Sequence, residues 1–197
     1  MLSSRHRDLF LPLFGPLSRG IAKLGVTPNH LTVAGAVLSA ASGVLFALGS
    51  NRWAGVVLIL GGLCDCLDGG VARATDTVSP FGAFLDSTVD RYSDLFVFGG
   101  LLYQSCSLKS PGLFVATFLA LIGSVMVSYT RARAESLIDD CQVGLAERPE
   151  RVILLVAGAL LGLLWWAVIA VAILANATAL QRILHTRERL RGGDNRA

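Results

Sequence analysis

The amino-acid sequence predicts an all-α integral membrane protein with six transmembrane helices and an N-terminal interfacial amphipathic segment. First, 53% of the 197 residues are hydrophobic and the mean hydropathy is +0.62, above the level of ordinary soluble domains. Second, apolar segments of about 20 residues, long enough to cross a bilayer, recur along the chain. Third, six spans would leave 14 Lys and Arg residues on one side and 2 on the other. An excess of Lys and Arg is typical of the cytoplasmic side of a membrane protein.

The N-terminal segment, residues 8–24, is expected to lie along the membrane surface. Its apolar residues fall roughly on one side of a helix, and Pro12 and Pro16 favour a broken segment over one straight helix. The first residues, MLSSRHRDLF, lack the apolar run of a cleavable signal peptide, so no removal is expected.

Four apolar spans follow in order. Thr27-Pro28 is typical of a helix start, with a capping residue followed by proline at the first helical position. The spans themselves are expected at about 31–50, 53–73, 81–103 and 112–130.

Residues 152–180 carry no charge, and this segment decides the topology. Its 29 residues are too many for one upright span and slightly few for two. A break near Gly162 would give two helices and place both termini on the same side. A single span would move the C-terminal arginines outside and spoil the charge asymmetry. We therefore expect a multi-pass protein of the cell (inner) membrane, with both termini and the acid-rich helix ends facing the cytoplasm.

Four aspartates stand between the second and third spans. Asp65 and Asp68 are spaced i, i+3, and Asp86 and Asp90 are spaced i, i+4, so each pair lies on one face of its helix. Two facing pairs form an acidic pocket, whose like charges require a cation. Carboxylate oxygens without nearby His suit hard divalent ions such as Mg²⁺ or Mn²⁺, which complete their coordination with water and phosphate. The pattern therefore indicates phosphate chemistry.

Small and basic residues accompany these acids. Gly69 and Ala72 share the face of the first pair, Arg73 adds a positive charge suited to phosphate oxygens, and Gly82 lies one helical turn before Asp86. The alternative is that the acids are solvated helix caps or ion-pair partners.

The spacing of Asp65, Asp68-Gly69, Ala72-Arg73, Gly82, Asp86 and Asp90 resembles the signature of the CDP-alcohol phosphotransferase (phosphatidyltransferase) family. The resemblance implies a membrane enzyme, a homodimer, that transfers a phosphatidyl group from a CDP-linked lipid to an alcohol and releases CMP. It implies that the four aspartates hold two divalent ions and that Asp90 is the catalytic base. The positions implied for CDP-lipid binding are Asn29, Asp65, Gly69, Ala72, Arg73 and Gly82. For Asn29, a role as helix-start cap is an equal alternative.

The four cysteines show neither zinc spacing nor a secreted disulfide framework. Cys64 and Cys66 flank Asp65, where they are either small apolar wall residues or thiolate ligands, which would favour a softer metal.

A second group of charges lies in the basic loop, residues 128–151. Arg131, Arg133, Arg148 and Arg151 fall within 21 residues. One interpretation is that these arginines only mark a cytoplasmic loop and contact lipid headgroups. However, Arg148 and Arg151 stand at the start of an apolar helix, where a positive charge opposes the helix dipole. Anion binding would offset that cost.

The basic loop also carries a narrower resemblance, to phosphatidylinositol-phosphate synthases. The segments that carry it are Ser128-Tyr129, Arg133-Ala134-Glu135, Glu147-Arg148-Pro149-Glu150-Arg151, residues 82–88 and Gln181-Arg182. It implies that an inositol phosphate acceptor binds to Ser128, Arg131, Arg148, Arg151 and Arg182. One departure is Arg131, since that position is commonly lysine in enzymes using inositol phosphate.

The sequence thus predicts one phosphatidyltransferase domain, residues 1–197, transferring a phosphatidyl group from CDP-diacylglycerol to a polyol phosphate, with inositol phosphate as the first choice. Glycerol 3-phosphate is the alternative acceptor, because it is also anionic. A divalent-cation transporter is the alternative from another class, although the acids lie near one membrane face and no pair of broken helices in related halves is evident. Nucleic-acid binding is not suggested at a net charge of +3.

Overall fold

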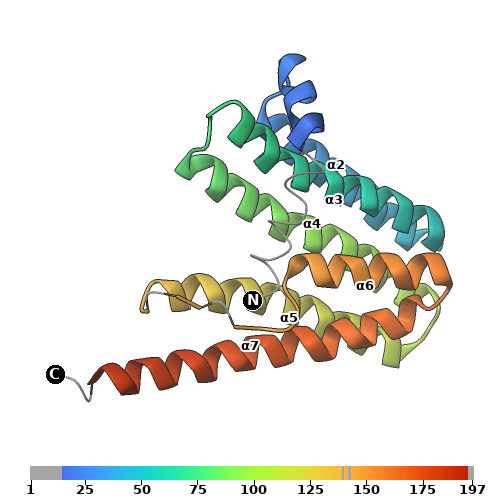
Figure 1. Ribbon diagram of the computed structural model, residues 1–197. Helices are drawn as coiled ribbons and strands as arrows, with labels where there is room; N and C mark the ends of the chain where they lie inside the picture. Colours follow the sequence, from blue (N-terminus) through green and yellow to red (C-terminus); the bar gives the residue numbers. More distant parts are fainter. Residues whose placement is uncertain (1–14, 139, 142, 195–197) are drawn as a thin grey trace. The chain divides into compact units, whose positions relative to one another are not determined.

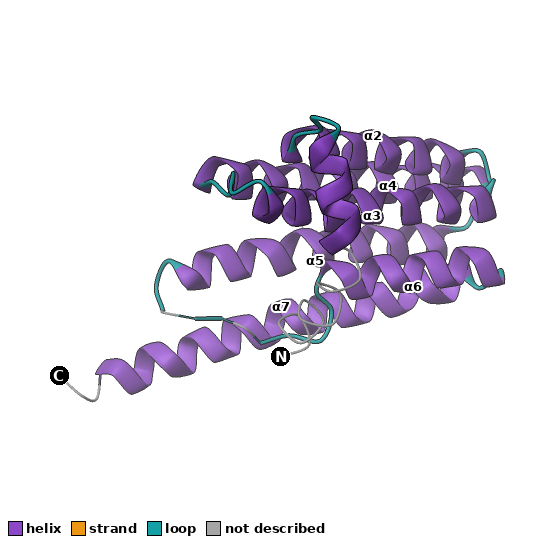
Figure 2. Cartoon of the chain, turned by 45° about the horizontal axis from the view of Figure 1, so that its top comes forward, coloured by secondary structure: helices purple, strands orange, loops and turns teal. Residues whose placement is uncertain are grey.

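The computed structural model describes residues 15–138, 140, 141 and 143–194, with side chains up to residue 191. Figure 1 shows the helices in chain order, and Figure 2 shows that the described part consists of helices and connecting loops. The all-α prediction is therefore confirmed. The chain divides into two compact units, Met1–Gln104 and Ser105–Ala197, which are described separately.

The first unit contains a short helix over residues 15–23, then α2 (Pro28–Ala47), α3 (Asn51–Ala74) and most of α4 (Pro80–Ser107). The start of α2 is as predicted. The Thr27 hydroxyl accepts a hydrogen bond from the His30 amide at 3.4 Å, and His30 Nδ1 accepts one from the Thr27 amide at 3.4 Å. The capping role considered for Asn29 thus belongs to Thr27, because Thr27 satisfies the free amides of the first turn.

Small residues bring α2, α3 and α4 into close contact. A Cβ atom added at Gly61 of α3 would lie 3.3 Å from the Gly35 carbonyl oxygen of α2. A Cβ atom at Gly100 of α4 would overlap the Gly43 carbonyl group of α2. Helices associate in membranes largely through such close backbone packing. At the opposite end from the aspartates, Gln104 Nε2 of α4 donates to Asn51 Oδ1 of α3 at 3.0 Å.

The helix over residues 15–23 packs against the aspartate-bearing part of α3. Ser18 is buried, and a Cβ atom added at Gly70 would overlap its hydroxyl oxygen. Leu17 of this helix and Leu24 directly after it are exposed. Residues 8–14 of the predicted interfacial segment lie outside the described residues.

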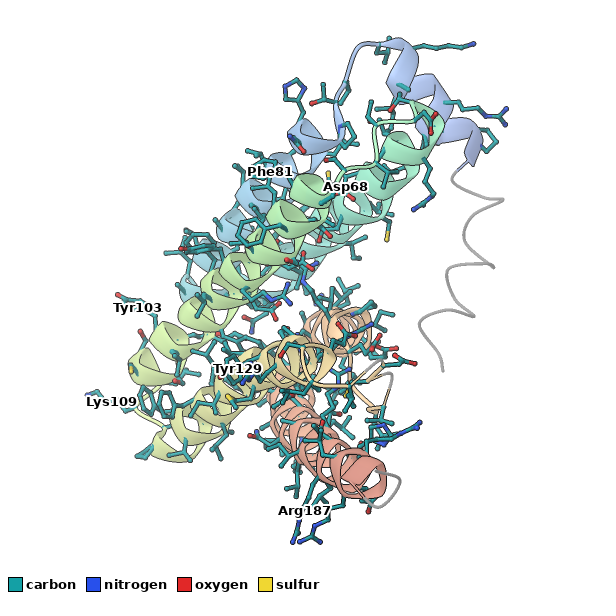
Figure 3. The ribbon with its side chains drawn as sticks, turned by 90° about the vertical axis from the view of Figure 1, so that its left-hand side faces the viewer. Asp68, Phe81, Tyr103, Lys109, Tyr129 and Arg187 are labelled. Atoms are coloured by element: carbon teal, nitrogen blue, oxygen red, sulfur yellow. The ribbon has the colours of Figure 1, made fainter. Side chains whose placement is uncertain are left out.

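The second unit contains α5 (Pro111–Glu135), α6 (Arg148–Leu161) and α7 (Leu164–Asp194). The predicted break is confirmed, since α6 ends at Leu161 and Gly162 adopts a left-handed conformation with φ 76°. Asn176 of α7 donates to the Leu119 carbonyl of α5 at 2.9 Å, beside Gly123. Figure 3 shows Arg187 pointing outward from the far end of α7, which continues well beyond the predicted limit at residue 180.

Among the described residues, four helices are long and apolar enough to cross a membrane: α2, α3, α5 and residues Leu164–Arg191 of α7. Large apolar side chains such as Val37, Val44 and Trp166 are exposed on them, as a lipid-facing surface requires. In contrast, α4 has 28 residues but carries Asp86, Asp90, Arg91 and Asp94 within its first 15. The 14 residues of α6 extend about 21 Å, less than the ~30 Å of a hydrocarbon core.

Candidate active site: a carboxylate cluster and an arginine cluster

The carboxylate cluster, Asp65, Asp68, Asp86 and Asp90, belongs to the first unit, and Asp68 is its most buried member. Asp68 is 7% exposed, and Figure 3 labels it among the helices of the first unit. Thr32 of α2, itself buried, donates its hydroxyl to Asp68 Oδ2 at 2.7 Å, and the Gly69 amide donates to Oδ1. The carboxylate is therefore fixed in direction by a neighbouring helix before any ligand binds.

Asp65 lies one turn earlier on α3 and also depends on α2. A Cβ atom at Gly35 would overlap Asp65 Oδ1, so a glycine at this position leaves the space that the carboxylate occupies. Gly35, Ser39 and Gly43 form a small-residue face of α2 at four-residue steps. This pattern was a signal in the sequence for the close approach of α3 and α4.

The second acid pair comes from α4. Asp86 is half-buried and lies close enough to Asp68 for its charge to act on that group, as does Asp65. Asp90 follows one turn later on the same face and is also half-buried. The two helices thus bring Asp65, Asp68 and Asp86 near one another. Within the described residues, however, no three His, Cys, Asp or Glu side chains form a ready-made metal-binding group.

The residues predicted to bind the CDP-lipid lie along the same ends of α2, α3 and α4. Arg73 is exposed and folds back along α3, with its Nη1 3.3 Å from where a Cβ of Gly69 would lie. Gly82 lies in the first turn of α4, where its amide donates to the Ser79 hydroxyl at 3.1 Å. Ala72 is half-buried and Asn29 is exposed at the start of α2.

The arginine cluster, Arg131, Arg148, Arg151 and Arg182, belongs to the second unit. Arg131 of α5 is 38% exposed; its Nε donates to Glu135 Oε1 at 2.8 Å and its Nη1 to Glu147 Oε1 at 3.1 Å. Arg151 in the first turn of α6 is buried, and its Nη1 donates to the Ala146 carbonyl at 3.1 Å. Arg148 and the predicted acceptor residue Ser128 are half-buried.

Arg182 of α7 is 1% exposed and bonded on three sides. It donates to the carbonyls of Val143 and Val127 at 2.8 and 2.6 Å, and to Glu147 Oε1 at 3.1 Å. Three of the four predicted acceptor arginines, Arg131, Arg151 and Arg182, thus contact the loop that precedes α6. Of these, Arg182 is buried and supports the loop from inside the protein.

A model of the CDP-alcohol phosphatidyltransferase family matches residues 25–183, which is most of the chain and includes every described residue of both clusters. The chain belongs to the CDP-alcohol phosphatidyltransferase family. It is accordingly an enzyme of a membrane-embedded family, and the resemblance noted in its sequence is confirmed.

Curated relatives of this phosphatidyltransferase cover nearly its whole length. The archaetidylinositol phosphate synthase of Pyrococcus horikoshii is 40% identical over 178 residues, covering 90% of this chain and 92% of that protein. The phosphatidylinositol phosphate synthase of Mycolicibacterium smegmatis is 38% identical over 190 residues, covering 90% of this chain and 85% of that protein.

Solved structures of the phosphatidylinositol phosphate synthase of Mycobacterium tuberculosis share the fold. Its crystal structure with CDP-DAG bound has a TM-score of 0.80 and 34% sequence identity, covering 89% of this chain and 93% of that one. Its complex with manganese and citrate has a TM-score of 0.77 and 35% identity, covering 87% of each chain.

Two residues of the phosphatidyltransferase were not assigned from its sequence. Glu147 accepts from both Arg131 and Arg182. Buried Thr178 of α7 accepts from the amides of Leu145 and Ala146 at 3.1 Å each. Neither contact has a sequence signal, because each joins residues more than 15 positions apart. Thr32 likewise acts through a contact between distant positions, since its hydroxyl donates to Asp68 Oδ2.

Proposed function

We propose that this phosphatidyltransferase transfers the phosphatidyl group of CDP-diacylglycerol to inositol phosphate and releases CMP. The observation that carries the proposal is the pairing of two sites in one chain: carboxylates prepared on α2, α3 and α4, and arginines gathered around the loop before α6. The relatives that match nearly the full length support inositol phosphate as the acceptor, since they are an archaetidylinositol phosphate synthase and a phosphatidylinositol phosphate synthase.

Two Mg²⁺ or Mn²⁺ ions would be held by Asp65, Asp68, Asp86 and Asp90. The residues fit this role, because the set offers oxygen donors alone and because Gly35 leaves room for the Asp65 carboxylate where any side chain would displace it. When bound, the ions would neutralise the diphosphate and stabilise CMP as the leaving group. The Mycobacterium tuberculosis structure that contains manganese supports a divalent ion in this fold.

The remaining chemistry belongs to side chains of this chain. Asp90 takes the proton of the acceptor hydroxyl as its oxygen attacks the β-phosphorus, so the new P–O bond forms while the P–O bond to CMP breaks. Arg73 contacts the phosphates, and Gly69, Ala72 and Gly82 leave room for the cytidine nucleotide beside the helix backbones. Asn29, exposed at the start of α2, also takes part in binding the CDP-lipid.

The acceptor phosphate is bound by Arg131, Arg148 and Arg151, with Ser128 as a further hydrogen-bond donor. Guanidinium groups suit this role because their planar donor array matches phosphate oxygens. Arg182 contributes through the loop it supports and by its positive charge. Arginine at position 131, where lysine is common in enzymes using inositol phosphate, makes the acceptor the point to test directly.

The proposal extends to the setting of the enzyme. Six helices cross the cell (inner) membrane, with α4 and α6 added to the four that meet length and composition alone, and the protein acts as a homodimer. The carboxylate cluster and both termini face the cytoplasm, where soluble polyol phosphates occur. The 14 to 2 distribution of Lys and Arg supports this orientation.

The decisive experiment offers purified protein CDP-diacylglycerol with Mn²⁺ or Mg²⁺ and one acceptor at a time: inositol phosphate, glycerol 3-phosphate, free inositol or serine. CMP release is measured together with the lipid product. We expect release with inositol phosphate and none without a divalent ion. Release with glycerol 3-phosphate and not with inositol phosphate would make the alternative acceptor correct. Preference for free inositol or serine would exclude phosphate binding by the arginines.

A further inference from the structure

Glu147 is the point at which the three helices of the second unit meet through charged groups. Its Oε1 accepts from Nη1 of Arg131 on α5 and from Nη2 of Arg182 on α7, both at 3.1 Å. It is also the N-cap residue of α6, and its backbone carbonyl accepts from the Arg151 amide at 3.2 Å. One residue therefore connects to all three helices that carry predicted acceptor arginines.

Arg131 is held by two of its three nitrogen atoms. Glu135 binds Nε and Glu147 binds Nη1, while no residue in the described part of the chain accepts a hydrogen bond from Nη2. With 38% of the side chain exposed, the guanidinium is fixed in plane and still has a donor for a ligand. A guanidinium held in this way loses less conformational entropy when it binds phosphate.

Arg182 determines where Glu147 lies. Because it is buried and bonded to the carbonyls of Val127 and Val143, its guanidinium has little freedom to move. A buried cation requires a negative partner, and Glu147 supplies it. Arg182 therefore fixes the position of Glu147, and Glu147 in turn fixes the orientation of Arg131.

The same loop also holds Arg151. The Ala146 carbonyl accepts from Arg151 Nη1, and Thr178 accepts from the amide of Ala146 on the other side. A shift of Glu147 would displace the first turn of α6 and with it the Arg151 guanidinium.

We propose that Glu147 is a positioning residue of the acceptor site. Glu147 orients the Arg131 guanidinium and fixes the first turn of α6, and it does not contact the substrate. This inference rests on the proposed function, because it assigns Arg131 and Arg151 to the acceptor phosphate. Glu147 is an acid in a site for an anion, and its single charge is shared between Arg131 and Arg182.

The two effects of removing the Glu147 charge have opposite signs. If Glu147 only repelled the acceptor phosphate, Glu147→Gln would lower the acceptor KM. If Glu147 positions the arginines, the same change raises that KM, because a glutamine amide cannot hold two guanidinium groups by charge. The direction of the change therefore distinguishes positioning from repulsion.

The experiment compares Glu147→Gln with Glu135→Gln, a matched control that removes the other carboxylate bound to Arg131. We expect Glu147→Gln to raise the KM for inositol phosphate about 10-fold or more, the scale of one charged hydrogen bond. The KM for CDP-diacylglycerol should stay within about twofold in both variants, and Glu135→Gln should raise the acceptor KM less than Glu147→Gln, because the Arg131–Glu135 ion pair is more exposed and Glu135 has no contact with Arg182. An unchanged or lowered acceptor KM in Glu147→Gln would overturn the proposal, and so would an equal rise in Glu135→Gln.

A double-mutant cycle supplies a readout that general loosening of the fold would not produce. In an Arg131→Ala background, Glu147→Gln should have a smaller effect on the acceptor KM than in the wild type, because the residue it aims is gone. Fully additive effects would show that Glu147 does not act through Arg131.

Glu147→Asp covers the case in which the neutral variant fails to fold, since it keeps the charge for Arg182. Its shorter side chain cannot bridge both guanidinium groups, so the acceptor KM should again rise selectively, and a value within twofold of wild type would contradict the proposal. Wild-type transfer to inositol phosphate is measured first. Absence of that transfer would refute the proposed function, whereas transfer with an unaltered KM in the Glu147 variants would refute only the positioning role.

Discussion

At the scale of single residues, uncharged neighbours help to position Asp68 and Asp65. The Thr32 hydroxyl and the Gly69 amide bind the two oxygens of Asp68, and Gly35 leaves space for Asp65. Hydrogen bonds of this kind favour the ionised carboxylate and fix its direction. Neighbouring residues therefore orient these carboxylates before a cation binds. Substitutions of the acids and of their neighbours test this role separately.

Asp90→Asn tests the role of the base. The change keeps the shape of the side chain but removes the proton acceptor and weakens one proposed metal ligand. We expect CMP release to fall by about 10²–10⁴-fold, the usual contribution of a general base. Binding of CDP-diacylglycerol, measured by calorimetry or by protection against thermal unfolding, should persist. Near-normal release at saturating Mn²⁺ would show that Asp90 is neither base nor essential ligand.

Gly35→Ala tests the space beside Asp65. The added methyl group would overlap Asp65 Oδ1, so the carboxylate must move and divalent-ion affinity should fall. Gly62→Ala on α3 is the matched control, because a Cβ there meets no atom within 4 Å. We expect the metal concentration for half-maximal activity to rise at least about 10-fold in Gly35→Ala, equivalent to ~1.4 kcal/mol, and to stay unchanged in Gly62→Ala. Equal values in the two variants would contradict the importance of this space.

At the scale of helices, the fold depends on backbones that approach closely. Gly43 of α2 faces Phe96 and Gly100 of α4, and on α7 Asn176 and Ala175 lie against Gly123 of α5. Apolar side chains are solvated equally well by lipid and by a protein core, so the hydrophobic effect does not drive membrane helices together. Close van der Waals contacts between the helices stabilise their association instead. The position of α4 then sets where Asp86 and Asp90 lie relative to α3.

Neighbouring glycines on α4 provide a test of this packing. Gly100→Ala would place a methyl group on the Gly43 backbone, whereas a Cβ at Gly99 meets nothing within 4 Å. We expect Gly100→Ala to destabilise the protein by about 1–3 kcal/mol, the usual cost of overpacking, and to lower its midpoint of thermal unfolding in detergent. Gly99→Ala should unfold at or slightly above the wild-type temperature because alanine favours helix. Equal midpoints for the two variants would show that α2 and α4 do not depend on this contact.

At the scale of the whole molecule, topology determines which clusters meet which compartment. The chain has long apolar helices, a 14-residue α6 and a 31-residue α7 that continues about 20 Å beyond Leu180, at 1.5 Å per residue. The extension carries Arg187, Arg189 and Arg191, which are exposed and suited to a cytoplasmic membrane surface. An even number of spans keeps this extension on the same side as the N-terminus.

Cysteine labelling in intact cells tests this topology. In a background without the four native cysteines, a cysteine at Ser110 should react with a membrane-impermeant reagent added outside. A cysteine at Gly192 should react only after the membrane is opened, because six spans return the chain to the cytoplasm. Permeabilised cells serve as the control that both sites are reactive. Labelling of the Gly192 position in intact cells would rule out six spans.

The sequence by itself determined the class of the protein and most of its helices, since both depend on local patterns. Runs of apolar residues marked the spans, Thr27-Pro28 marked the start of α2, and the break near Gly162 followed from the length of an uncharged segment. The four aspartates were found from spacing, because carboxylates on one helix face are set by helix geometry alone. Family membership then followed from the same positions.

Only the tertiary structure decided which residues hold those groups in place. The bond from Thr32 to Asp68 joins positions 36 apart, and the bond from Arg182 to Glu147 joins positions 35 apart. Such contacts arise when separate helices pack, and local sequence patterns carry no record of them. Arg182 shows the difference most clearly: its charge and its resemblance predicted acceptor binding, whereas its burial and three protein partners make it the support of the loop. A guanidinium serves either role, and the packing of α5 against α7 selects between them.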